Sequence, residues 1–238
     1  MPGFGQAPLL LCASGYAVHP DLTTVSPARP ALPLFPAGQE QTMAATADRE
    51  KTVLRELASY YSARVVPTLA TLRACVFAAR LTSEILTEFE IPHEIAHVDV
   101  LVVNDEWWEY CVEKGISDVA HVPDTAWSVS CYSDEKPEKN GFPGHLVVET
   151  DDFLVDLSSG QFDRPQHKIV TNAPLVAPLG SLLELPDNWW SVPIHEGRYM
   201  FRNAAVPRMP SRGSPDWSRN CWSSITECEK LIRRALDE

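Results

Sequence analysis

The prolines of this chain are unevenly distributed, and they limit where regular structure can form. Of the 20 prolines, seven precede residue 37 and eight lie between Pro165 and Pro215. Proline lacks a backbone N–H and fixes one backbone dihedral angle, so it interrupts helices and central strands. Regular secondary structure is therefore expected to concentrate in the middle of the chain.

Length and composition favour one globular domain preceded by a tail. A chain of 238 residues with a hydrophobic share of 45% can bury a sizeable core. Residues 1–42 combine Pro, Ala, Gly and Thr with few charges and no sustained periodicity, which is typical of an extended segment. We therefore predict a Pro-rich extended tail over residues 1–42 and a single domain over residues 43–238, with Met43 as a candidate natural start.

The charge and hydropathy of the chain argue against two classes of partner. A formal net charge of −12 leaves no basic face for nucleic acid or anionic lipid. The longest apolar run near the start, Pro8 to Ala13, is far shorter than the roughly 18 residues that span a bilayer. We predict no nucleic-acid partner and no membrane association.

The cysteines indicate a reducing environment. There are six, at positions 12, 75, 111, 131, 221 and 228, and they form neither a Cys-x-x-Cys pair nor a dense disulfide framework. Reduced thiols in a cytoplasmic protein are the expectation. One of these thiols is then available as a nucleophile.

The order of the predicted elements favours an α+β domain. Helical periodicity over residues 45–63 and 68–89 comes first, and the Val-rich run of residues 95–103 then indicates a buried strand. A short helix over residues 105–114, a strand over residues 126–132, a hairpin, a strand over residues 197–203 and a C-terminal helix over residues 218–236 follow. Helices first and an antiparallel sheet afterwards are typical of this class.

The hairpin allows a register to be predicted. Residues 145–149 and 153–157 read as two strands around a turn at Asp151 and Asp152, which are turn formers. An even-numbered loop places Thr150 opposite Phe153, and then His145 and Asp156 share one face as diagonal neighbours about 7 to 8 Å apart. The spacing permits a His-Asp pair.

A second pattern, His93-Glu94-Ile95-Ala96-His97, matches the motif of zinc peptidases. In that motif two imidazoles one helical turn apart hold the metal and the Glu activates a water molecule. Here the motif runs into a β-branched segment. On a strand, His93 and His97 would lie roughly 13 Å apart, too far to chelate one ion.

Three dispersed residues offer the alternative chemistry. A thiol nucleophile needs an adjacent imidazole and a carboxylate that orients the ring, and Cys75, His145 and Asp156 supply these in order. Taken alone, a Cys among apolar residues is more often part of the buried core, so Cys75 is a candidate only together with His145 and Asp156. Cys111 and Cys131 are the fallback thiols.

The chain resembles the transglutaminase-like core of the papain-like cysteine enzyme superfamily. The resemblance rests on Arg73-Ala74-Cys75-Val76-Phe77-Ala78-Ala79-Arg80 on a long helix, followed by the strands that carry His145 and Asp156, and it covers about residues 68–165. It implies Cys75 as nucleophile, His145 as base and Asp156 as orienting acid, with an acyl-enzyme formed from an amide or thioester. It also implies a papain-like fold with N-terminal helices packed on an antiparallel sheet.

One departure from this pattern concerns the oxyanion. No Gln lies shortly before Cys75 to act as a papain-type donor, so the backbone N–H of Cys75 needs a second donor that the sequence does not identify. Gln161 follows Asp156 too far along the chain to be given a role on sequence grounds.

Three functional hypotheses follow. The leading one is a thiol-dependent acyltransferase or amide hydrolase that needs no metal or cofactor and acts on a peptide, a protein or a small acyl substrate. The alternatives are a zinc metallopeptidase using His93, Glu94 and His97, and a non-catalytic papain-like binding module.

Overall fold

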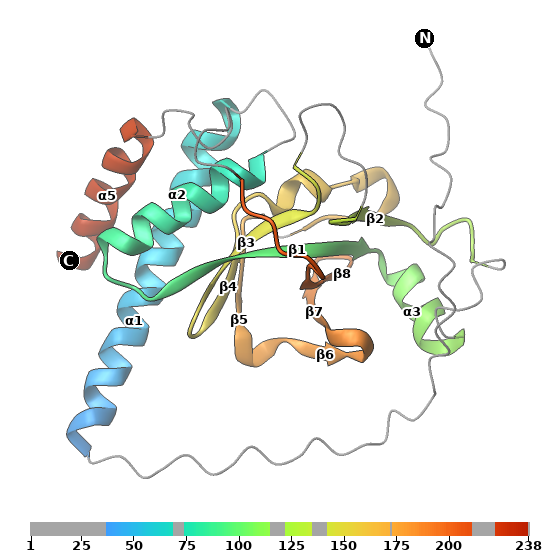
Figure 1. The fold of residues 1–238 in the computed structure, drawn as a ribbon, viewed down its shortest axis with the longest axis horizontal. Helices are drawn as coiled ribbons and strands as arrows, with labels where there is room; N and C mark the ends of the chain where they lie inside the picture. The colour runs from blue at the N-terminus through green and yellow to red at the C-terminus, as the bar shows by residue number, and fades with distance from the viewer. Residues whose placement is uncertain are drawn as a thin grey trace.

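The protein has an α+β fold in which helices pack against a curled antiparallel sheet, as the order of predicted elements indicated (Figure 1). The computed structural model describes residues 37–68, 74–114, 122–134, 142–171, 173–210 and 222–237. Its α-helices are α1 (Ala37–Tyr60), α2 (Ala74–Glu88), α3 (Asp105–Lys114) and α5 (Trp222–Asp237). Its strands are β1 (His93–Val103), β2 (Ser128–Cys131), β3 (His145–Thr150), β4 (Phe153–Asp156), β5 (Leu175–Pro178), β6 (Leu183–Leu185), β7 (Trp189–Ile194) and β8 (Gly197–Asn203).

The long strand β1 organises the sheet. The strand order is β5-β4-β3-β1-β8-β7-β6, and every described pairing is antiparallel. On one edge β1 pairs first with β3 and then with β2, while its other edge pairs with β8. A long central strand thereby brings β3, with its hairpin partner β4, close to the C-terminal strand β8.

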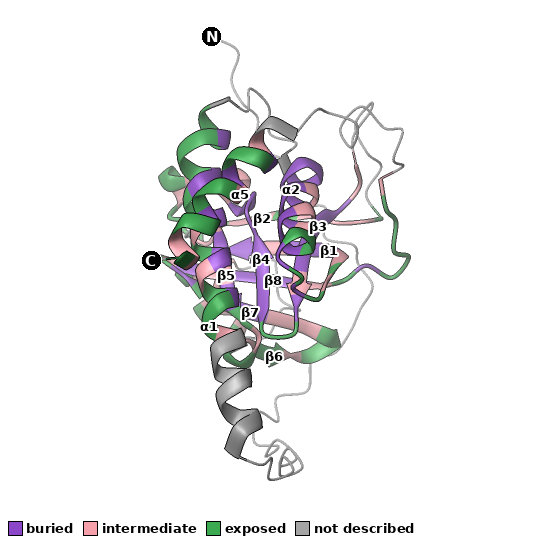
Figure 2. Cartoon of the chain, turned by 90° about the vertical axis from the view of Figure 1, so that its left-hand side faces the viewer, coloured by how far each residue is buried: buried purple, intermediate pink, exposed green. Residues whose placement is uncertain are grey.

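Two apolar clusters lie on opposite faces of the sheet. The first joins α1, α2 and α5 to one face of the β3–β4 hairpin, where Leu146, Val148 and Val155 are buried (Figure 2). The second fills the inside of the curl with residues of β1, β5, β7 and β8. Alternation along β3 therefore sends successive side chains into two separate cores, which is why this strand has almost no exposed residue.

Most predicted elements of the central region are confirmed. α3 and β8 have the predicted bounds, and β2 lies inside the strand predicted over residues 126–132. The hairpin register is also confirmed, because Val148 pairs with Val155 and Glu149 with Leu154, which sets Thr150 opposite Phe153.

The predicted tail needs a correction at its end. α1 begins at Ala37, so residues 37–42 are helical and not extended, whereas residues 1–36 lie outside the described part of the chain. Residues 37–43 consist mostly of Ala, Gln, Glu and Met, which are good helix formers. The prolines just before this segment favoured an extended chain and outweighed that helical preference in the prediction. Among the described residues, no helix is both long and apolar enough to cross a bilayer.

Candidate active site

Three elements bring Cys75, His145 and Asp156 together. Cys75 lies in the first turn of α2, His145 is the first residue of β3, and Asp156 is the last residue of β4. The Nε2 atom of His145 lies 2.9 Å from Oδ2 of Asp156, and the Cys75 thiol is near enough to the same imidazole to help raise its pKa. The diagonal His-Asp pair predicted from the hairpin spacing is therefore present, with the thiol beside it.

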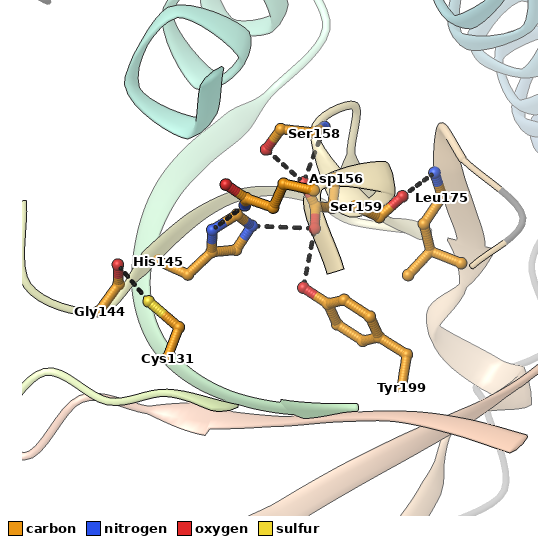
Figure 3. A network of polar contacts seen from close by, with 9 residues as sticks. Cys131, Gly144, His145, Asp156, Ser158, Ser159, Leu175 and Tyr199 are labelled. Atoms are coloured by element: carbon orange, nitrogen blue, oxygen red, sulfur yellow. Dashed lines mark hydrogen bonds and ion pairs between the residues drawn. The ribbon is translucent and has the colours of Figure 1, made fainter. Parts of the chain in front are cut away.

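The carboxylate of Asp156 is held by four donors (Figure 3). Oδ2 accepts from His145 and from the hydroxyl of Tyr199 at 2.8 Å, while Oδ1 accepts from the backbone N–H and the hydroxyl of Ser158, both at 2.9 Å. Charge-assisted hydrogen bonds of this kind compensate a buried carboxylate for the water it has lost. Neither oxygen is free to rotate away from His145.

The electrostatics of the pair favour its charged form. Burial opposes charge on both groups, and each side chain is only 1% exposed. For His145 the opposite charge and hydrogen bond of Asp156, assisted by Cys75, outweigh burial and raise its pKa to about 10. For Asp156 the contacts with His145, Tyr199 and Ser158 outweigh burial and lower its pKa.

This pair should make protein stability depend on pH. The stability that His145 contributes to the folded state is complete below its unfolded pKa of 6.5 and is lost as the pH rises toward 10. The stability that Asp156 contributes is lost as the pH falls below its unfolded pKa of 3.8. We expect the thermal unfolding midpoint to fall as the pH is raised from 6.5 toward 10, and this slope to flatten in His145→Gln. A midpoint that falls equally steeply in that variant would contradict the assignment.

The remaining described cysteines are less suited to be nucleophiles. Burial raises the pKa of Cys111 and of Cys228 to about 12, so both stay protonated at neutral pH. The thiol of Cys131 donates to the carbonyl oxygen of Gly144 at 3.1 Å, next to His145 (Figure 3). Cys12 and Cys221 lie outside the described residues.

The zinc motif lies on a strand and not on the helix that its chemistry requires. His93 contacts Ser83 Oγ and the carbonyl oxygen of Ile91, each at 2.8 Å. Both ring nitrogens of His97 are also bonded to protein groups, so neither imidazole is directed toward a shared ion. In the part of the chain that the structure describes, no three His, Cys, Asp or Glu side chains are grouped to hold a metal ion.

His97 instead has a structural contact near the site. Its Nδ1 accepts the backbone N–H of Arg208 at 2.9 Å, and its Nε2 donates to the carbonyl oxygen of Pro143 at 2.8 Å. Pro143 and Gly144 immediately precede His145. The ring thus fixes the backbone from which the catalytic candidate projects.

Two residues near the triad were not assigned a role from the sequence. Nε2 of Gln161 lies 2.9 Å from Nδ1 of His145. Tyr61, which opens a π-helical turn (Tyr61–Val65), is 1% exposed, and its hydroxyl has no hydrogen-bond partner within the described residues. Burial, with the charges of Asp156 and Cys75, raises the pKa of Tyr61.

Comparisons with protein-family models, with curated proteins and with solved structures found no match to the chain. We therefore infer a function from the geometry of this site.

Proposed function

We propose that the protein is a transglutaminase-like thiol enzyme that transfers or hydrolyses an acyl group through an acyl-enzyme on Cys75. The observation that carries the proposal is the buried His145–Asp156 hydrogen bond, with the Cys75 thiol near enough to the imidazole to help raise its pKa. A papain-like arrangement of the fold is part of the same proposal, supported by a helix that opens with the thiol and packs beside the hairpin bearing His145 and Asp156.

Each of the three groups has a defined task in this chemistry. His145 takes the thiol proton, and the resulting imidazolium stabilises the thiolate, which the positive end of the α2 dipole also favours. Asp156 keeps the ring in one orientation and compensates its charge. The thiolate then attacks a carbonyl carbon of a peptide, a glutamine side chain or a small acyl donor, and water or an amine accepts the acyl group. Such a thiol needs a reducing compartment, which agrees with a cytoplasmic location.

The test is alkylation of the full-length protein with iodoacetamide across a range of pH, with mass spectrometry to locate the label. We expect Cys75 to react rapidly at neutral and mildly acidic pH in the folded protein, and the rate to drop by at least about tenfold in His145→Ala, because the imidazolium that stabilises the thiolate is gone. His195→Ala, which removes an imidazole from the turn between β7 and β8, is the matched control and should leave the rate unchanged.

A non-catalytic module is the second candidate, and one observation favours it: the Cys75 side chain is only 7% exposed. A thiol that reacts only after denaturation would support this candidate and would overturn the enzyme proposal.

A further inference from the structure

Gln161 reaches the reacting end of the His145 ring. It lies in the short 3-10 helix Ser159–Phe162 that follows β4, and its backbone is fixed on both sides: its N–H donates to Ser158 at 3.0 Å and its carbonyl oxygen accepts from Arg164 at 3.0 Å. The turn directs the side-chain amide to Nδ1 of His145, at 2.9 Å. Because Nε2 faces Asp156, the proposed function assigns proton exchange with the Cys75 thiol to Nδ1, the same nitrogen that the Gln161 amide contacts in the structure.

The contact between Gln161 and His145 depends on the protonation of the ring. Neutral His145, with its proton on Nε2 facing Asp156, has a lone pair on Nδ1 that accepts the Gln161 N–H. In the imidazolium, Nδ1 carries a proton and is itself a donor, so the amide N–H loses its acceptor. The Gln161 amide N–H is therefore free of the ring whenever His145 is an imidazolium, the form that the raised pKa of His145 favours and that accompanies the thiolate.

We propose that Gln161 supplies the second oxyanion donor, alongside the backbone N–H of Cys75. This inference rests on the proposed function. The amide lies next to the base, 2.9 Å from Nδ1 of His145, and its N–H becomes available in the protonation state in which negative charge develops on the substrate oxygen. A donor prearranged in this way lowers the barrier because no solvent has to reorganise.

The acyl-transfer step uses only groups that the protein and its substrate supply. The thiolate sulfur donates an electron pair to the carbonyl carbon and forms a C–S bond, while the C=O π pair moves to the oxygen, which accepts from Gln161 and Cys75 N–H groups. When that pair returns, the bond to the leaving group breaks. The departing amine takes the proton from Nδ1 of His145, and the neutral ring accepts the Gln161 amide again.

Two reactions of Cys75 separate this role from a structural one. Alkylation by iodoacetamide displaces iodide from a saturated carbon and builds no oxyanion, whereas acylation by p-nitrophenyl acetate does. We expect Gln161→Ala and the isosteric Gln161→Glu to lower the Cys75-dependent acylation rate by about 10²-fold. The rate of Cys75 alkylation at mildly acidic pH should stay equal or rise in these variants. The Gln161 amide stabilises the neutral ring by donating to Nδ1, so its removal favours the imidazolium that stabilises the thiolate.

The controls make each outcome decisive. Gln166→Ala removes an exposed Gln from the next turn and should leave both rates unchanged. Equal losses of alkylation and acylation in the Gln161 variants would mean that Gln161 only positions His145, and would overturn the inference. A selective loss of acylation in Tyr61→Phe but not in the Gln161 variants would overturn it in favour of the Tyr61 hydroxyl. If wild-type Cys75 reacts with neither reagent, both the inference and the proposed function are wrong. That result is recognisable because the Gln161 variants then have the same rates as the wild-type protein with both reagents.

Discussion

Asp156→Asn is expected to lower the Cys75-dependent acylation rate by about 10⁴-fold, the loss seen when the carboxylate of a Ser-His-Asp triad is changed to an amide. The reason is the tautomer of His145. An Asn amide that keeps its oxygen on Ser158 presents its NH₂ to Nε2 of His145, so the imidazole must accept there and carry its proton on Nδ1. A ring protonated at Nδ1 while neutral cannot take the proton of the Cys75 thiol.

Release of p-nitrophenolate from p-nitrophenyl acetate measures this effect, with circular dichroism to verify that the variant is folded. Asp151→Asn is the matched control, because Asp151 is exposed in the hairpin turn and makes the same change of charge. A folded Asp156→Asn protein that keeps the wild-type rate would show that the carboxylate only supports packing and does not orient His145.

The hairpin that carries this pair was predictable because its information is local. A strand of alternating period, a two-residue turn and a second strand determine which residues share a face, and no other part of the chain is needed. The same holds for β1. Its β-branched residues predicted a strand, and they outweighed the match of His93 and His97 to a zinc motif that requires a helix.

The third contact to Asp156 could not be predicted in the same way. Tyr199 reaches the carboxylate only because β8 pairs with β1 on the edge opposite β3, and that strand order joins residues far apart in sequence. β5, β6 and β7 were also missed. Pro178 and Pro193 lie in β5 and β7, so the proline-rich composition of residues 165–215 concealed three short strands.

Gln161 was set aside because of its distance from Asp156 along the chain. In the structure, the 3-10 helix after β4 turns the chain back, so that the Gln161 side chain lies next to His145. A signal for such a turn was present in Ser158-Ser159-Gly160, since Ser and Gly favour turns after a strand.

Gly197→Ala should be the most damaging single substitution for stability, with a loss of more than about 4 kcal/mol of unfolding free energy or no folded protein at all. Gly197 opens β8 with φ at +141°, a region essentially restricted to glycine, and an added Cβ would lie 1.9 Å from the carbonyl oxygen of Val103 and 2.8 Å from Cα of Asn104. Both obstacles are backbone atoms of the central strand β1 and the residue after it, so no side-chain rotation relieves the clash.

Urea unfolding measures this loss, and Gly180→Ala is the matched control. Gly180 is exposed, and a Cβ there would meet nothing within 4 Å, so the same substitution should change stability by less than about 0.5 kcal/mol. The damage at Gly197 should also reach the candidate active site, because Tyr199 lies two residues further along β8 and donates to Asp156. Variant protein that folds with wild-type stability would show that β8 does not pair with β1 in the register described, and the Tyr199 contact with Asp156 would have to be abandoned with it.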